Sequence, residues 1–214
     1  MPIKAYYSLE PGKVVVAEEI ASRYPSLQVF FPQEDKGVDL IVLGDMSRAA
    51  RYPLTIQVKE SRYYGDSPKV HSWHQVHKSK LEDLIEEMDF FVFMTYVDLP
   101  KGNKMGFRKE FIIVSAQDLA EICRTKKSSK DIYSFYFSFQ YDSNWTKVLD
   151  VRDMKENWQW DKAPSYSNYY DNWDQIVDTL EDEEDIRGGL RALADPEESI
   201  SWETFKEDLM RDSV

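Results

Sequence analysis

The sequence is poor in cysteine and lacks any long hydrophobic run. The single cysteine, Cys123, cannot form a disulfide within the chain. The longest uninterrupted hydrophobic run, from Phe90 to Met94, is far shorter than the roughly 20 residues of a membrane-spanning helix. The first residues also lack the basic start and apolar stretch of a secretory signal. We therefore expect a cytoplasmic protein that does not insert into a membrane.

Glycine and proline are scarce as well, with 8 and 9 residues among 214, which argues against a fibrous or low-complexity chain. The hydrophobic fraction of 42% and the aromatic fraction of 14% are high enough to build a buried core. A chain of this length is near the upper end for one ordinary domain, so we expect one main domain with an appendage.

Basic residues are in the minority, with 27 Lys+Arg against 39 Asp+Glu and a net charge of -12. An even spread of this charge would oppose binding to a polyanion. The spread is uneven, because residues 1–130 hold 19 basic against 18 acidic side chains, whereas residues 131–214 hold 8 against 21. The acidity therefore belongs to the second part of the chain.

Hydrophobic periodicity predicts an α/β fold in which helices flank a mixed central β-sheet. One of the helices is expected to open at Ser115, where Asp118 completes a capping box. Residues 142–170 show no clear period and are expected to be rich in loops. The other expected elements are helices over residues 14–23, 73–85 and 173–180, and strands over residues 27–31, 38–43, 54–59, 90–97, 111–114 and 133–141.

Three polar residues stand out within these strands. Asp39 opens an otherwise apolar strand, where a carboxylate is costly unless it meets a cation or hydrogen-bond donors. Alternation in a later strand places Gln57 and Lys59 together on its polar face. If the strands converge, Asp39 and Gln57 could ligate Mg²⁺ with the Val58 carbonyl between them, and Lys59 could orient or deprotonate water. The alternative is that Asp39 caps the turn before its strand.

The segments GVDLIVL and TIQVKESRYY, which carry these residues, resemble the core motifs of PD-(D/E)XK nucleases. The likeness is to the QxK variant found among Mrr-like restriction enzymes and some intron-encoded homing endonucleases. The resemblance implies a restriction-endonuclease-like fold, dependence on Mg²⁺ or Mn²⁺, and DNA as the substrate. It also implies that Asp39 and Gln57 ligate the metal and that Lys59 is the catalytic lysine.

Three positions depart from the family's pattern. Val38 stands where the family has a proline, and the neutral Gln57 stands where the ExK form has a carboxylate. The glutamate that the family expects in its first helix falls on Lys13. The resemblance therefore assigns the catalytic and metal-binding carboxylate of that helix to Glu19, with Glu18 in second place. A solvated helix face is the alternative for both glutamates.

Residues that follow the lysine predict a nucleic-acid channel. Arg62 and Tyr63 come soon after Lys59 and combine a phosphate-binding cation with a ring that can stack on bases. Trp73, His74 and Lys78 belong to the next predicted helix and are expected beside the same channel. The alternative is a surface helix whose tryptophan docks into the core.

Two further polar clusters are weaker candidates. His71, His74 and His77 are spaced by three and could lie near one helix face, but a zinc site would need further ligands, so none is expected. The basic run at residues 124–130 could contact a phosphate backbone, with a solvated loop as the alternative.

The acidic run at residues 181–185 predicts a boundary between a nuclease-like domain over 1–180 and an acidic helical tail over 181–214. Two small helices are expected in the tail. It loosely resembles the C-terminal helices of bacterial antitoxins, which wrap partner proteins. Folding back over a basic cleft, or completing the core, are the alternatives.

Taken together, these patterns predict a Mg²⁺-dependent endonuclease that cleaves DNA in restriction, defence or mobile-element biology. The alternative is a catalytically inactive protein of the same fold whose acidic tail binds a partner protein. A homodimer is one option for either function, but no segment is a distinctive dimer interface.

Overall fold

The structure is a computed structural model that describes residues 10–33, 37–44, 52–61, 70–84, 88–101, 104–143, 145–154 and 162–194. Its helices are α1 (Pro11–Arg23), α2 (Lys78–Leu84), α3 (Ala116–Thr125), the 3-10 helix η2 (Ser167–Tyr169) and α4 (Asp174–Ala194). Its strands are β1 (Gln28–Phe30), β2 (Leu40–Leu43), β3 (Leu54–Glu60), β4 (Ser72–His77), β5 (Phe90–Lys101), β6 (Lys104–Ser115), β7 (Ile132–Tyr141) and β8 (Thr146–Asp150).

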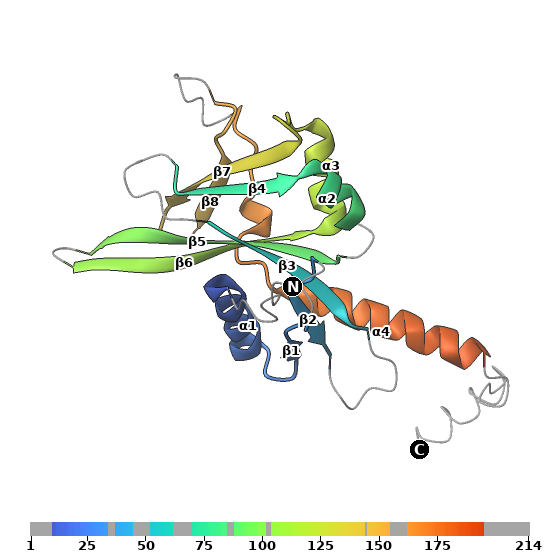
Figure 1. Ribbon diagram of the computed structural model, residues 1–214. Coiled ribbons are helices and arrows are strands. Elements are labelled where there is room, and N and C mark those ends of the chain that lie inside the picture. Colours follow the sequence, from blue (N-terminus) through green and yellow to red (C-terminus); the bar gives the residue numbers. More distant parts are fainter. Residues whose placement is uncertain are drawn as a thin grey trace, which may run out of the picture.

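The strands form two sheets (Figure 1). The larger sheet has the order β1-β2-β3-β5-β6, in which only the β3–β5 pair is parallel. The smaller sheet has the order β4-β7-β8 and is antiparallel. The expected α/β class with a mixed sheet is confirmed. The second sheet was not expected, because its first strand lies in a predicted helix and its last in a predicted loop.

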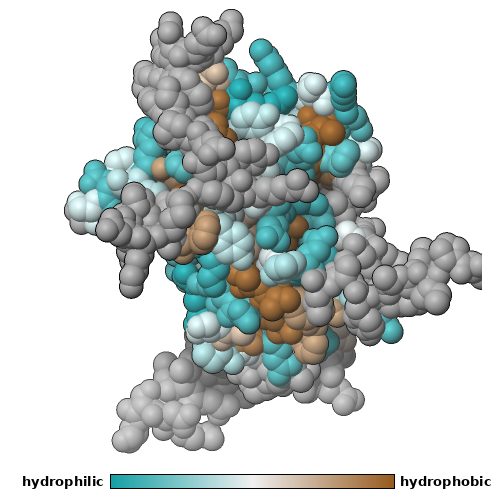
Figure 2. All heavy atoms as spheres, turned by 60° about the vertical axis from the view of Figure 1, so that its left-hand side comes forward, coloured by the Kyte–Doolittle hydropathy of each residue, from teal (hydrophilic) through white to brown (hydrophobic). Residues whose placement is uncertain are grey.

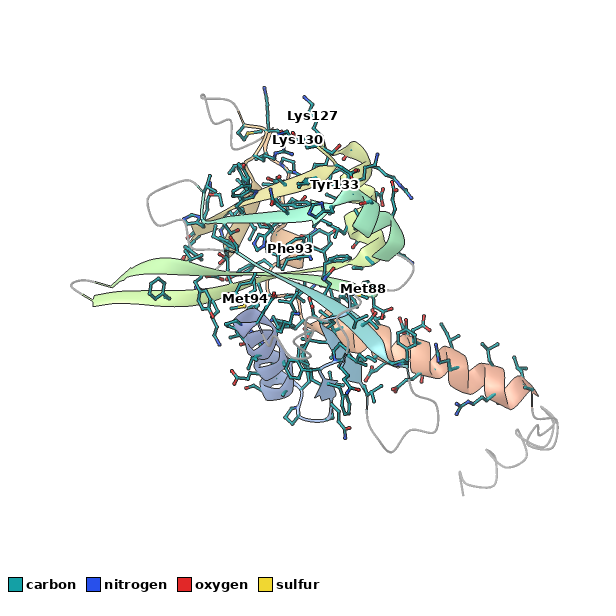
Figure 3. All side chains as sticks on the ribbon, in the orientation of Figure 1. Met88, Phe93, Met94, Lys127, Lys130 and Tyr133 are labelled. Atoms are coloured by element: carbon teal, nitrogen blue, oxygen red, sulfur yellow. The ribbon has the colours of Figure 1, made fainter. Side chains whose placement is uncertain are left out.

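The five-stranded sheet separates two hydrophobic cores, and β5 contributes to both. Phe91 and Phe93 belong to the core between the two sheets, whereas Val92 and Met94 belong to the core under α1 and α4. Figure 3 shows the same division, with Phe93 between the sheets and Met94 on the α1 side. Strand residues that are apolar on both faces are typical of a sheet covered on both sides.

Helices α1 and α4 cover the outer face of the five-stranded sheet (Figure 1). Helix α4 buries Ile176 and Leu180 in that core. It then continues through the acidic run at 181–185 without a break, so the two separate helices expected on either side of this run are one helix. Its second half, which includes Leu190 and Leu193, is exposed.

The prediction of a helix over residues 73–85 is wrong in its first part. Ser72–His77 is a strand in which Ser72, His74 and Val76 are buried and the intervening side chains are exposed. The sequence hides this alternation because two of the three buried side chains are polar. Only the following residues form a helix, so the three histidines do not share a helix face.

Other expected elements are confirmed. Ser115 caps α3, where its hydroxyl accepts a hydrogen bond from the Asp118 amide. Within the described part of the chain, no helix is long and apolar enough to cross a membrane. Figure 2 shows one side of the surface, where a hydrophobic patch is bordered by hydrophilic residues.

Candidate active site

Asp39 lies where β2 meets the middle of β3. Its backbone amide donates to the Ile56 carbonyl at 2.9 Å, which extends the ladder between the two strands by one residue. The next contact with β3 comes from the Asp39 side chain, because Oδ2 accepts a hydrogen bond from the Val58 amide at 2.7 Å. The Asp39 carboxylate is therefore buried, with a relative exposure of 5% for the residue, and fixed by the end of a strand pair.

Lys13 of α1 supplies the counter-charge of this carboxylate. Its Nζ lies 2.8 Å from Asp39 Oδ1, and the two side chains are only 12% and 4% exposed. Helix α1 is held against β3 by a further contact, since the Gly12 amide donates to Glu60 Oε2 at 2.9 Å. A Cβ on Gly12 would lie 2.7 Å from that oxygen, so the close approach needs glycine.

Gln57 lies beside Asp39 and is 7% exposed. Its Nε2 is 3.4 Å from Asp39 Oδ2, a long hydrogen bond, and its Oε1 has no hydrogen-bond partner among the described residues. A buried carbonyl oxygen without a partner costs about 1–3 kcal/mol. The residue that contacts the Asp39 carboxylate thus also has a buried amide oxygen without a partner, and carboxylate and amide oxygens are ligands that suit a hard cation.

Lys59 follows Gln57 on the same face of β3 and lines an open cavity of about 660 Å³. The other walls of the cavity are the residues that precede and begin α1, the end of β3, and residues 73–75 of β4. The two sheets are tied together at this point, because the Trp73 amide donates to Ser61 Oγ at 2.9 Å.

His74 belongs to the stretch of β4 that lines the cavity, and its side chain lies on the buried face of that strand, with the residue 2% exposed. Its ring packs against Phe93 and Phe137, at centroid distances of 5.2 and 5.6 Å. Burial lowers its pKa to about 3; a hydrogen bond with the Lys59 backbone opposes this fall and the Lys59 charge adds to it. The imidazole is therefore neutral at neutral pH.

The structure does not bring Glu19 to this site. Glu19 Oε1 accepts from Arg23 Nε at 2.9 Å, one helical turn away, and its other oxygen lies 4.0 Å from Lys109 Nζ. Glu18 is exposed on α1. The carboxylate expected from the first helix is thus paired elsewhere, and the helix presents Lys13 to Asp39 instead.

The predicted nucleic-acid contacts are divided among several places. Trp73 and His74 lie at the cavity, whereas Lys78 opens α2 and is exposed. Arg62 and Tyr63 lie outside the described residues.

In the basic run at 124–130, Lys126 forms a buried ion pair with Asp150 and lies over the Phe135 ring. This pairing assigns Lys126 to the core rather than to phosphate contact. Figure 3 shows Lys127 and Lys130 beyond the three-stranded sheet, on the opposite side from α1.

The oxygen atoms at Asp39 fit a metal ion in part. Asp39 and Gln57 Oε1 are two suitable donors, and the Val58 carbonyl belongs to the same stretch of β3. No group of three His, Cys, Asp or Glu side chains that could hold a metal occurs among the described residues. A divalent cation at Asp39 would lie close to the Lys13 ammonium on the same carboxylate, and the repulsion between the two cations opposes its binding unless Lys13 moves aside.

Sequence reasoning found the strand positions of Asp39, Gln57 and Lys59 but missed the roles of Lys13, Glu60 and Ser61. The only advance signal for Lys13 was its position in the first helix, where the PD-(D/E)XK pattern that the sequence resembles has an acid. No family model, curated protein or solved structure matches this chain.

Proposed function

We propose that this protein is a metal-dependent endonuclease of the PD-(D/E)XK type that hydrolyses DNA phosphodiester bonds. The observation that carries the proposal is the buried amide of Gln57, whose Oε1 has no partner among the described residues and whose Nε2 is 3.4 Å from the Asp39 carboxylate. The strand that holds Gln57 also carries Lys59 into an open cavity. Two oxygens for a cation and an ammonium group for a phosphate therefore come from adjacent positions.

Asp39 and Gln57 would hold Mg²⁺ or Mn²⁺, with the Val58 carbonyl as a further donor. Such an ion, when bound, stabilises charge on the phosphate and lowers the pKa of water. Lys59 places a positive charge where negative charge develops on the phosphate oxygens during attack by water. The ladder contacts of Asp39 keep its carboxylate in place, and the Lys13 ammonium is the group that moves when an ion binds.

A cleavage assay on supercoiled, linear duplex and single-stranded DNA with Mg²⁺ or Mn²⁺ tests the proposal. Lys59→Ala should lower the rate by at least about 100-fold, the usual cost of one charge-stabilising group. Lys109→Ala is the matched control, because this lysine is exposed and pairs with Glu19 away from the cavity. The proposal is wrong if no substrate is cut, or if Lys59→Ala cuts as fast as the control.

A second function is favoured by the ion pair between Lys13 and Asp39. An ammonium group already neutralises the carboxylate at 2.8 Å, as it would in a protein that keeps the fold without a metal. Such a protein would be a catalytically inactive interaction protein that binds a partner through its acidic tail. Thermal melting during a Mg²⁺ or Mn²⁺ titration separates the two functions, because a ligand that binds only the folded state raises the melting temperature. A rise that vanishes in Asp39→Asn supports the enzyme, and no rise supports the inactive protein.

A further inference from the structure

We infer that the exposed second half of α4 is a docking surface for a basic amphipathic helix of a partner protein. Ile186, Leu190 and Leu193, which we call the α4 stripe, make the contact. The inference goes beyond the endonuclease function and does not depend on it. For the second function, partner binding through the acidic tail, it names the contact residues and the chemistry of the partner.

The α4 stripe is an apolar helix face that the described part of the chain leaves exposed. Its three side chains are 57%, 60% and 84% exposed, although the first half of the same helix buries Ile176 and Leu180. Spacings of four and three residues place the stripe on one side of the helix. Figure 1 shows α4 extending past the edge of the five-stranded sheet. A regularly spaced apolar face of this kind suits recognition of a partner helix or groove.

Two glycines interrupt the same half of α4. Glycine weakens a helix relative to alanine, and a Cβ added at Gly188 or Gly189 would meet nothing within 4 Å. Close packing within the described chain therefore does not require glycine at either position. Gly189 follows Ile186 by three residues and precedes Leu193 by four, which places it at the edge of the stripe. A residue without a side chain at this edge lets the backbone of a partner helix approach closely.

Acidic side chains border the α4 stripe. Helix α4 carries seven acidic and two basic residues. Asp182 and Glu183 precede the first residue of the stripe by four and three positions, so they lie on the same side of the helix. The arginines are directed elsewhere, because the Arg187 guanidinium lies 4.7 Å from the centroid of the Tyr52 ring and Arg191 follows it by one helical turn. The border of the stripe is therefore negative.

This negative border selects the occupant. It attracts a basic partner and repels nucleic acid and anionic membrane surfaces. A second copy of the chain would bring an identical acidic border against the first. Residues 195–214 hold seven acidic and two basic side chains, so this segment also carries the wrong charge. A basic amphipathic helix fits both features, because its apolar face covers the stripe and its lysines or arginines meet the carboxylates.

Fluorescence anisotropy with the full-length protein and a labelled helical peptide of about 18 leucine and lysine residues tests the inference. The leucines of the peptide recur every three or four positions. The double variant Ile186→Gln, Leu190→Gln should weaken binding at least about tenfold, because glutamine keeps the helix and removes the apolar contact. Trp145→Gln removes another exposed apolar side chain and should bind the peptide as the parent does.

Two further arms test the charge. A peptide with glutamate in place of every lysine should bind the parent at least about tenfold more weakly. The double variant Asp182→Asn, Asp185→Asn should weaken binding of the lysine peptide at low salt but have little effect at high salt, since salt screens exposed charges. No binding of the lysine peptide, or equal binding by the parent and the stripe variant, overturns the inference. Equal binding of the lysine and glutamate peptides overturns it as well.

Melting and sedimentation of the stripe variant exclude occupants from the chain itself. Its melting temperature should lie within about 2 °C of the parent's, because exposed side chains contribute little to stability. A larger fall would mean that the chain covers its own stripe. A dimer of the parent that the variant dissolves would make a second copy the occupant, and either result overturns the inference. The stripe shares no residue with the cavity at Lys59, so in the metal-dependent cleavage assay the variant should behave as the parent does. Loss of docking is thereby distinguished from failure of the endonuclease function.

Discussion

Replacing Lys13 by methionine isolates the ion pair at the centre of the site. Methionine keeps the unbranched stem of the lysine and removes only the ammonium group, so packing on α1 changes little. The Asp39 carboxylate then loses its 2.8 Å partner while it stays buried. Breaking a buried pair on one side typically costs 3–5 kcal/mol. The Val58 amide still bonds the carboxylate, so we expect a loss near the lower end, about 3 kcal/mol.

Urea unfolding in EDTA at neutral pH measures this loss. The midpoint should fall without a change in the m-value, because the same surface is exposed on unfolding. The double variant with Asp39→Asn should recover most of the stability, since removing both charges leaves no buried charge without compensation. The exposed Lys109→Met serves as the control and should change the free energy of unfolding by less than about 0.5 kcal/mol.

Mg²⁺ added to Lys13→Met tests whether the ammonium stands in the place of a metal ion. Removing it should let the ion reach the Asp39 carboxylate, which would stabilise the variant by about 2.7 kcal/mol at 100 times the dissociation constant. The parent protein should need more Mg²⁺ for the same effect. If Lys13→Met is as stable as the control, or if Asp39→Asn does not rescue it, the ion pair does not compensate a buried charge and the reasoning fails.

Three further predictions concern the same region and the core. Gly12→Ala should lower the melting temperature, because its Cβ would lie 2.7 Å from the Glu60 carboxylate and loss of that cap costs about 1 kcal/mol; a higher melting temperature would contradict this. His74 has a folded pKa of about 3, so the unfolded chain binds more protons near pH 5, and the free energy of unfolding should fall by about 2 kcal/mol between pH 8 and pH 5. His74→Phe should remove that part of the pH dependence in chemical unfolding, and an unchanged slope would exclude His74 as its source. Lys126→Met should lower the free energy of unfolding in urea by about 3–5 kcal/mol, because Asp150 stays buried without its partner. A decrease below about 1 kcal/mol would contradict a buried ion pair at Lys126.

The strands of the five-stranded sheet could be predicted because their residues are hydrophobic and because turns mark where they begin and end. Leu54, Ile56 and Val58 are all buried, as their alternation predicts. Strand β4 could not be predicted, because its buried positions include Ser72 and His74, which no hydrophobic pattern detects. Tertiary packing decides that strand, since its partner β7 is aromatic and forms the other half of the core between the sheets.

Only those positions of the site that strand alternation determines could be predicted from the sequence. Asp39 and Gln57 meet because neighbouring strands bring them together, and the strand pattern contains that information. The partner of Asp39 depends on how α1 docks, which Gly12 and Glu60 determine through a contact between residues 48 positions apart. Glu19 does not reach Asp39 for a local reason: it forms an ion pair with Arg23, which lies one helical turn along the same face of α1. Sequence alone therefore predicted the acid but not its counter-ion.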